Sequence, residues 1–142
     1  MRRWLAGQDE AVSGWAGAQL GITFVQPLRA FGIINEADAL IGAAIFNDFY
    51  PGGNVELTYV GPGTMTRTVL CGLADFAFLR LEASRVTVKQ RRGNPNMKGL
   101  NGRAGFSFEM IQKRYYGPTR DDDALVFVLW RKDAHRWLKG MN

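Results

Sequence analysis

The segment spanning residues 54–90 constrains the fold of this chain more than any other. Residues 54–60 (NVELTYV) alternate apolar and polar side chains, as a half-buried strand does. Glycines follow at 61–63, and residues 64–80 then repeat apolar side chains at i, i+4 and i+8, which predicts an amphipathic helix. Residues 85–90 alternate again. A strand, a helix and a second strand in this order predict an α/β arrangement in which helices cover a sheet.

The flanking patterns extend this arrangement in both directions. Before it, the spacing predicts a helix over 9–20 and two strands over 29–34 and 39–49. After it, we expect a short helix over 95–104, strands over 106–114 and 124–130, and a helical turn around 135–138. Early antiparallel strands followed by alternating strands and helices predict a mixed sheet with helices on both faces.

Length and composition set the class of protein. The 142 residues, 46% of them hydrophobic, predict one domain over 1–142 that buries its own core. One cysteine and one histidine leave no intramolecular disulfide and no His/Cys metal cluster, so we expect no metal. The start, MRRWLAGQDE, is not a secretory signal, and no apolar stretch is long enough to span a bilayer. We therefore expect a cytoplasmic protein with no membrane partner.

The net charge of +5 is concentrated in one segment. Residues 85–120 hold nine Lys and Arg residues against a single acid, Glu109. A concentrated positive field favours a polyanionic ligand. A phosphorylated cofactor and a nucleic acid both meet that requirement, so charge alone does not choose between them.

The segment 94–106 (NPNMKGLNGRAGF) resembles a motif of the GNAT family of N-acetyltransferases. In that family a short helix begins at an Asn, and a basic residue stands two positions before a Gly-Phe pair. Here Asn94 lies eleven residues before Gly105, Arg103 occupies the basic position, and Phe106 completes the pair. The order of elements also fits, and the chain is similar to small family members of bacteriophage and prophage genomes.

The resemblance implies a mixed, mostly antiparallel sheet of six or seven strands, splayed in the middle, with helices on both faces. Strands 54–60 and 85–90 would part, and the pantetheine arm of acetyl-CoA would insert between them. The cofactor's pyrophosphate would lie on the loop before helix 64–80, where the family pattern is [Q/R]-x-x-G-x-[G/A]. Gly63 falls on the first glycine of that pattern, while Val60 and Met65 depart from it.

A helix start offers unpaired N–H groups to phosphate, and glycines let the backbone approach closely. We expect Thr64 to be the N-cap of that helix and Arg67 to add a fixed charge. The residues that the resemblance implies for cofactor binding are Tyr59, Val60, Gly61, Gly63, Thr64, Met65, Thr66, Arg67, Asn94, Lys98 and Arg103.

The implied reaction is direct attack of a primary amine on the thioester of acetyl-CoA. Removing the amine proton needs a base, and Glu56, on the strand beside the thioester, is the candidate. The family often uses a Tyr seven residues after the helix-capping Asn as the acid for the leaving thiolate. That position is Asn101 here, so Tyr115 and Tyr116 are the candidates. The basic segment favours an acidic or phosphorylated acceptor, in a site shaped by the loops 21–28 and 115–123.

Two other classes of function stay open. The chain could be a non-catalytic module that keeps this fold for protein contacts, such as a phage virion or regulatory component. It could also bind nucleic acid through residues 85–120, although stacking aromatics are not interleaved with that basic run. A monomer and a homodimer are equally compatible with the sequence, as are the host cytoplasm and the virion.

Overall fold

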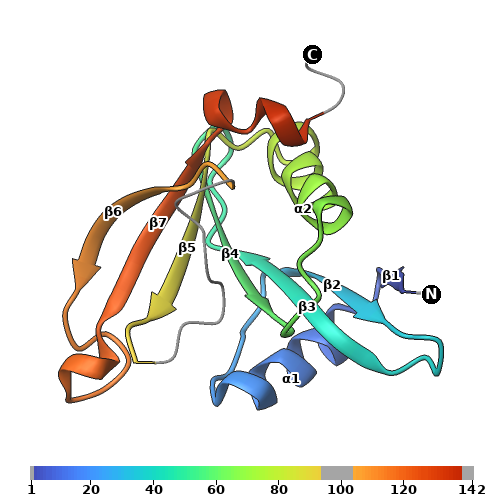
Figure 1. The fold of residues 1–142 in the computed structure, drawn as a ribbon, viewed down its shortest axis with the longest axis horizontal. Helices are drawn as coiled ribbons and strands as arrows, with labels where there is room; N and C mark the ends of the chain where they lie inside the picture. Colours follow the sequence, from blue (N-terminus) through green and yellow to red (C-terminus); the bar gives the residue numbers. More distant parts are fainter. Residues whose placement is uncertain (1, 94–103, 139–142) are drawn as a thin grey trace.

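A computed structural model describes residues 2–93 and 104–138. Within these residues seven strands form one sheet, in the order β1-β2-β3-β4-β5-β7-β6 (Figure 1). The strands are β1 (Arg3–Leu5), β2 (Arg29–Ile34), β3 (Leu40–Asn47), β4 (Asn54–Val60), β5 (Arg85–Arg91), β6 (Ser107–Gln112) and β7 (Ala124–Trp130). Neighbouring strands pair antiparallel, except for β4 and β5, which are parallel. The prediction of a mixed, mostly antiparallel sheet is confirmed.

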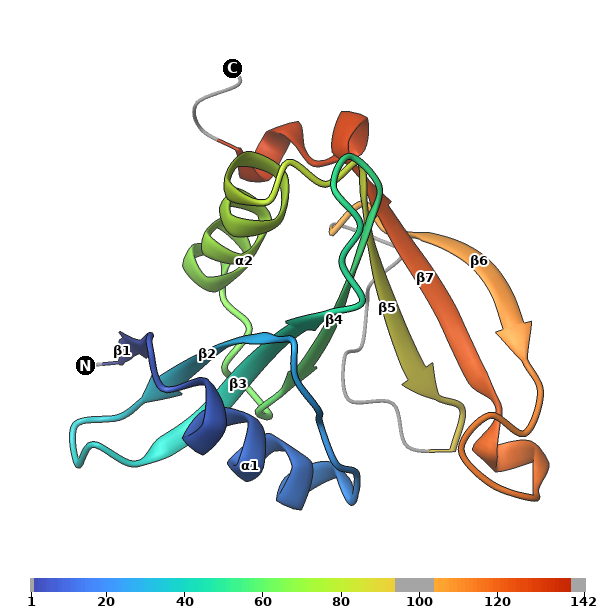
Figure 2. The ribbon, with the colours of Figure 1, turned by 180° about the vertical axis from the view of Figure 1, so that it is seen from behind.

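The two α-helices of the described residues cover opposite faces of this sheet (Figures 1 and 2). Helix α1 (Asp9–Leu20) buries Val12 and Ala16 in a core with alternate side chains of β2 to β4. Helix α2 (Arg67–Ala74) continues as a π-helix, Asp75–Arg80, and packs on the other face. Because side chains alternate along a strand, β4 contributes to both cores: Leu57 faces α2, and Val60 faces α1.

Three short 3₁₀ turns complete the described chain. They cover Arg120–Asp122, before β7, and Arg131–Asp133 and His135–Trp137, after it. The last two lie above the sheet beside α2, where Trp137 and Leu138 are buried (Figure 1). The expected helical turn near residue 135 is therefore present.

Several boundaries differ from the sequence-based expectation. The short edge strand β1 was not predicted, because three residues carry too little alternation. Helix α2 begins after Thr66, not after Thr64, because the Thr66 side chain accepts the Val69 N–H. The predicted short helix over 95–104 falls almost wholly outside the described residues.

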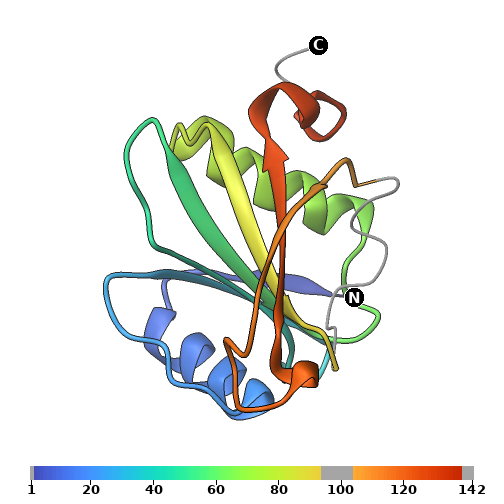
Figure 3. The same cartoon turned by 90° about the vertical axis from the view of Figure 1, so that its left-hand side faces the viewer.

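The parallel strands β4 and β5 separate after a short paired stretch. Their register covers Asn54 with Arg85, Val55 with Val86, and Glu56 with Thr87. Beyond these three pairs β4 continues to Val60 and β5 to Arg91 without pairing to each other. Figures 1 and 2 show the two strands diverging from their common start, and the side view of Figure 3 shows α2 above the sheet and α1 below it. The predicted splay in the middle of the sheet is confirmed.

Candidate functional site

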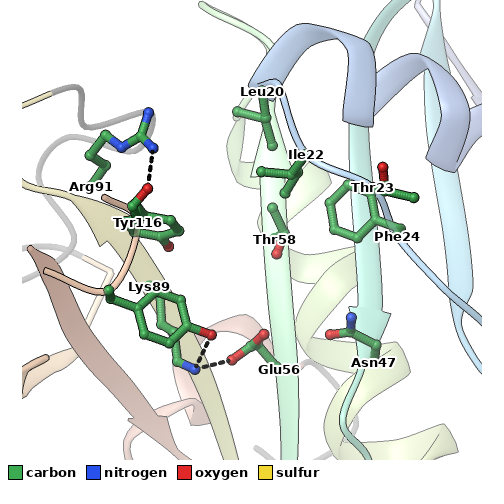
Figure 4. A pocket seen from close by; sticks show the side chains of 11 residues that line it. Leu20, Ile22, Thr23, Phe24, Asn47, Glu56, Thr58, Lys89, Arg91 and Tyr116 are labelled. Atoms are coloured by element: carbon green, nitrogen blue, oxygen red, sulfur yellow. Dashed lines mark hydrogen bonds and ion pairs between the residues drawn. The ribbon is translucent and has the colours of Figure 1, made fainter. Parts of the chain in front are cut away.

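A cavity of about 310 Å³ opens between the diverging strands on the face that carries α1. Its walls come from β3, β4 and β5, from the chain that follows α1, and from the loop before β7 (Figure 4). The lining residues are Leu20, Ile22, Thr23, Phe24, Asn47, Glu56, Thr58, Lys89, Arg91, Tyr115 and Tyr116. One wall is therefore apolar, and the other holds charged and phenolic groups.

The strand period places the charged groups of the cavity. Thr87, Lys89 and Arg91 share one face of β5, while Val86 and Val88 are buried on the other. Lys89 reaches across the gap to β4, where its ammonium lies 3.1 Å from a carboxylate oxygen of Glu56 (Figure 4). Both side chains are 20% exposed, so this ion pair is largely withdrawn from water.

Each of the two tyrosines in the cavity contacts one cation of β5. The Lys89 ammonium lies 3.4 Å from the Tyr115 hydroxyl and 4.6 Å from the centre of its ring. The Arg91 guanidinium lies 5.0 Å from the Tyr116 ring centre and donates to the Tyr116 carbonyl at 3.4 Å. The rings meet edge to face, with centres 4.9 Å apart. Such contacts fix aromatic side chains more firmly than packing alone.

Acidic residues organise the loop that presents these tyrosines. The Asp122 carboxylate accepts from the Thr119 backbone and hydroxyl, and the Asp122 carbonyl accepts the Tyr116 N–H. The buried Asp123 carboxylate accepts the Arg114 N–H and pairs with Arg92. Asp122 and Asp123, at the end of this loop, thus stabilise its conformation.

The pKa values of two of these groups are raised, so both remain protonated at neutral pH. Burial alone would lower the pKa of Lys89, but the charge and hydrogen bonds of Glu56 and Tyr115 outweigh it and raise the pKa above its ordinary value. Burial raises the pKa of Tyr116, and the neighbouring Tyr115 and Glu56 raise it further against the opposing charges of Lys89 and Arg91. The Tyr116 hydroxyl is therefore a proton donor at neutral pH.

The predicted phosphate loop lies between the end of β4 and α2. Gly61 has φ 136°, and a side chain there would collide with Gly42 and with the carbonyl oxygen of Ile41. Gly63 has φ 73°, and a side chain there would meet nothing within 4 Å. Gly61 is therefore required for packing, while Gly63 leaves backbone that a ligand can approach.

The side chains around this loop differ from the expectation. The Thr64 hydroxyl is buried and donates to the Gly61 carbonyl at 2.6 Å, so it accepts from the Tyr59 hydroxyl at 2.5 Å. The side chains of Val60 and Met65 pack against the two cores. Val60, Thr64 and Met65 can therefore contact a phosphate only through their backbone groups.

Three exposed groups lie at the start of α2. The Thr66 hydroxyl caps the helix, and the Arg67 guanidinium lies 5.2 Å from the ring centre of Trp137. Arg2 donates to the Gly63 carbonyl at 3.0 Å and brings a second cation to the loop. This contact joins residues far apart in the chain, so no local pattern could have predicted it.

The structure brings three predicted catalytic residues, Glu56, Tyr115 and Tyr116, into one cavity. The predicted cofactor residues from Tyr59 to Arg67 form a separate loop, while Asn94, Lys98 and Arg103 lie outside the described residues. Sequence reasoning missed Lys89, although alternation along the strand places it on the face opposite Val88.

Comparison with solved structures gives the fold. The spermidine/spermine N-acetyltransferase SpeG of Vibrio cholerae, in a mutant form, matches with a TM-score of 0.74 and 13% identity over 96% of this chain and 98% of that one. The same enzyme in complex with CoA and spermine matches with a TM-score of 0.71 and 12% identity over 94% and 98%. The chain has the GNAT acetyltransferase fold. At these identities the likeness extends to the architecture alone.

Sequence comparisons add nothing to this likeness, since no family model and no curated protein matches the chain. Among the described residues, no group of His, Cys, Asp and Glu is placed to hold a metal ion. The described helices are all too short or too polar to cross a membrane.

Proposed function

We propose that this chain is an acetyl-CoA-dependent N-acetyltransferase, one domain over residues 1–142, that transfers an acetyl group to a primary amine. The observation that carries the proposal is the parting of β4 and β5 after three paired residues, with an open cavity between them. A structural module with a filled sheet would not need that opening.

The parting leaves two strand edges that a pantetheine arm fits. Along its other edge, β4 pairs with β3 from Glu56 to Val60, and β5 pairs with β7 over its whole length. The edges that face the gap therefore carry backbone groups without a described partner strand. Backbone N–H and C=O groups need hydrogen-bond partners, and the two amides of pantetheine supply both kinds in an extended chain.

The pyrophosphate of the cofactor would lie on the loop at Gly63. The open backbone at this glycine, the start of α2 and the cations Arg2 and Arg67 all favour an anion there. Thr66 would add its exposed hydroxyl, and Gly61 and Thr64 would act through the backbone. The contributions of Asn94, Lys98 and Arg103 remain predictions from the resemblance.

Glu56 would remove a proton from the attacking amine. Its carboxylate lines the cavity on β4 beside the point where the strands part. The Lys89 ammonium fixes its position at 3.1 Å, so the carboxylate is held in place before the acceptor arrives. The amine then attacks the thioester carbonyl, its proton passes to Glu56 directly or through one water, and the C–S bond breaks.

Tyr116 would protonate the departing thiolate. Its hydroxyl is protonated at neutral pH, and its ring is held in the cavity wall by Arg91. Tyr115 is hydrogen-bonded to Lys89 and is the second candidate for this role. This assignment replaces the family's Tyr, whose position is Asn101 here.

The two alternative functions lose support. A non-catalytic module would be favoured by side chains that fill the gap, whereas a cavity is present. A nucleic-acid binder would use the free cations of residues 85–120. Three of these cations, Arg85, Lys89 and Arg92, are instead paired with Glu109, Glu56 and Asp123.

Titration with acetyl-CoA tests the proposal directly. A ligand that binds the folded protein stabilises it by about 2.7 kcal/mol at a hundredfold excess over its Kd. We expect saturable binding by calorimetry, a matching rise in Tm, and release of the CoA thiol on addition of amines, polyamines included. A chain that shows no binding at millimolar acetyl-CoA is not an acetyltransferase.

A further inference from the structure

The Asp122 carboxylate lies 3.7 Å from Arg91, outside the lining of the cavity between β4 and β5. Within the described lining, cations outnumber carboxylates by two to one. Its ionisable carboxylate and guanidinium or ammonium groups are Glu56, Lys89 and Arg91. The one carboxylate of this described lining is already paired with Lys89 at 3.1 Å. A polycationic acceptor would therefore find no unpaired carboxylate among these residues, and it would approach two cations.

The pairing of charges weakens toward the open end of the cavity. At the closed end, Arg85 forms two hydrogen bonds with Glu109, at 2.8 and 2.9 Å. Lys89, two strand positions beyond Thr87, still reaches Glu56. Arg91 lies two positions beyond Lys89, and no ion pair joins it to the Glu56 carboxylate. The next β4 residue in the cavity lining is Thr58, which carries no charge.

Arg91 consequently retains donor capacity. Its Nε lies 3.7 Å from the Asp122 carboxylate, and one Nη donates to the Tyr116 carbonyl at a long 3.4 Å. Among the described residues it makes no shorter polar contact, and its side chain is 39% exposed. A guanidinium has five N–H donors in a planar fork, which matches a carboxylate or a phosphate.

We propose that the acceptor carries an anionic group, a carboxylate or a phosphate, which binds Arg91 while its amine faces Glu56. This inference rests on the proposed acetyltransferase function. Glu56 is in register with Thr87, and Arg91 lies four positions further along β5, so the amine and the anion of the acceptor would bind at separate points of the cavity. The acceptor class is a small amphoteric amine.

Matched amines that differ in one group test this assignment. Lysine differs from cadaverine by its carboxylate, and 3-aminopropyl phosphate differs from 3-aminopropanol by its phosphate. A hydrogen-bonded charge contributes enough binding energy to raise kcat/KM about ten- to a hundredfold for the anionic member of a pair. The two pairs also show which of the two anions is preferred.

Two variants test whether Arg91 causes the preference for the anionic amine. Arg91→Gln removes the proposed anion ligand, and we expect the preference within each pair to fall below about threefold, a loss of the charged contact. Lys113→Gln makes the same change in net charge at an exposed residue outside the cavity, and it keeps the preference.

The failure of this inference is distinct from that of the proposed function. Binding of acetyl-CoA together with a preference for cadaverine or spermidine overturns the anionic acceptor and leaves the acetyltransferase. Calorimetry on CoA-loaded protein repeats the comparison without turnover, and no binding of the anionic members overturns it as well. Absence of acetyl-CoA binding overturns both.

Discussion

Replacing Gly63 with valine separates cofactor binding from folding. Gly63 has φ 73°, and the space around it is open, so a side chain there enters solvent or the path of a ligand. The left-handed backbone costs an L-residue about 1–2 kcal/mol, and a β-branched residue at least that much. In a chain of this size that loss lowers Tm by roughly 3–8 °C.

Gly52 provides a matched control. It has the same φ of 73°, it also has nothing within 4 Å of a built side chain, and it lies in the turn before β4. Gly52→Val therefore imposes the same backbone strain at the opposite end of β4 from the phosphate loop. We expect both variants to lose similar stability in thermal unfolding.

Only the Gly63 variant should change the affinity for acetyl-CoA. Losing one or two charge-assisted hydrogen bonds to the pyrophosphate removes about 1.5–3 kcal/mol each, which corresponds to a Kd at least tenfold higher. Calorimetric titration of the two variants and the parent chain measures the difference. Equal Kd values for both variants would refute the placement of the pyrophosphate at this loop.

Three further predictions concern Glu56, the two tyrosines of the cavity, and the buried Tyr59. Glu56→Gln should lower kcat at neutral pH by about a hundredfold or more, with Kd for acetyl-CoA nearly unchanged, since a general base contributes that much; unchanged kinetics would remove Glu56 from the mechanism. Tyr116→Phe should lower kcat more than Tyr115→Phe, and equal kcat values for the two variants would contradict the assignment. Because the pKa of Tyr116 is raised, any alkaline loss of kcat that depends on its hydroxyl should begin at a higher pH than an ordinary tyrosine would give. Burial also raises the pKa of Tyr59, so the neutral form that stabilises the fold is present below pH 10, and its contribution is lost as pH rises beyond that value. Denaturant unfolding from pH 8 to 11 should therefore show a smaller alkaline loss in Tyr59→Phe than in the parent chain.

The sequence predicted the elements of the site better than its contacts. Alternation in β4 and β5 and the stripe of α2 follow from local periodicity, and each was assigned within a few residues. Local pattern alone predicts the N-cap two residues too early, because Thr64 and Thr66 are equally good caps by residue type. Their roles were decided by Tyr59, which binds the Thr64 hydroxyl and keeps it in the interior.

Local periodicity could not predict which residues the charged side chains contact. The ion pair of Glu56 with Lys89 joins residues on different strands, and it exists because the two strands begin in register and then diverge. Its geometry depends on the exact angle between the strands, which no pattern in either strand encodes. The same holds for Arg2 at Gly63 and for Arg67 over Trp137, where contacts form between distant parts of the chain.

The folded chain fixes the divergence of β4 and β5, because one hydrophobic core contains side chains from both strands. On the α2 face, Leu57 and Tyr59 of β4 and Val88 of β5 belong to one buried cluster. On the α1 face, the packed cluster includes β2, β3 and β4 side chains, and the space beside β5 is the cavity. The two halves of the sheet are thus fixed to each other from one side and open on the other. A cofactor that enters this gap meets edges already apart, so its binding energy is not spent on separating strands. Under the proposed function the acceptor would approach from the α1 face, where Glu56, Lys89 and Arg91 line the cavity.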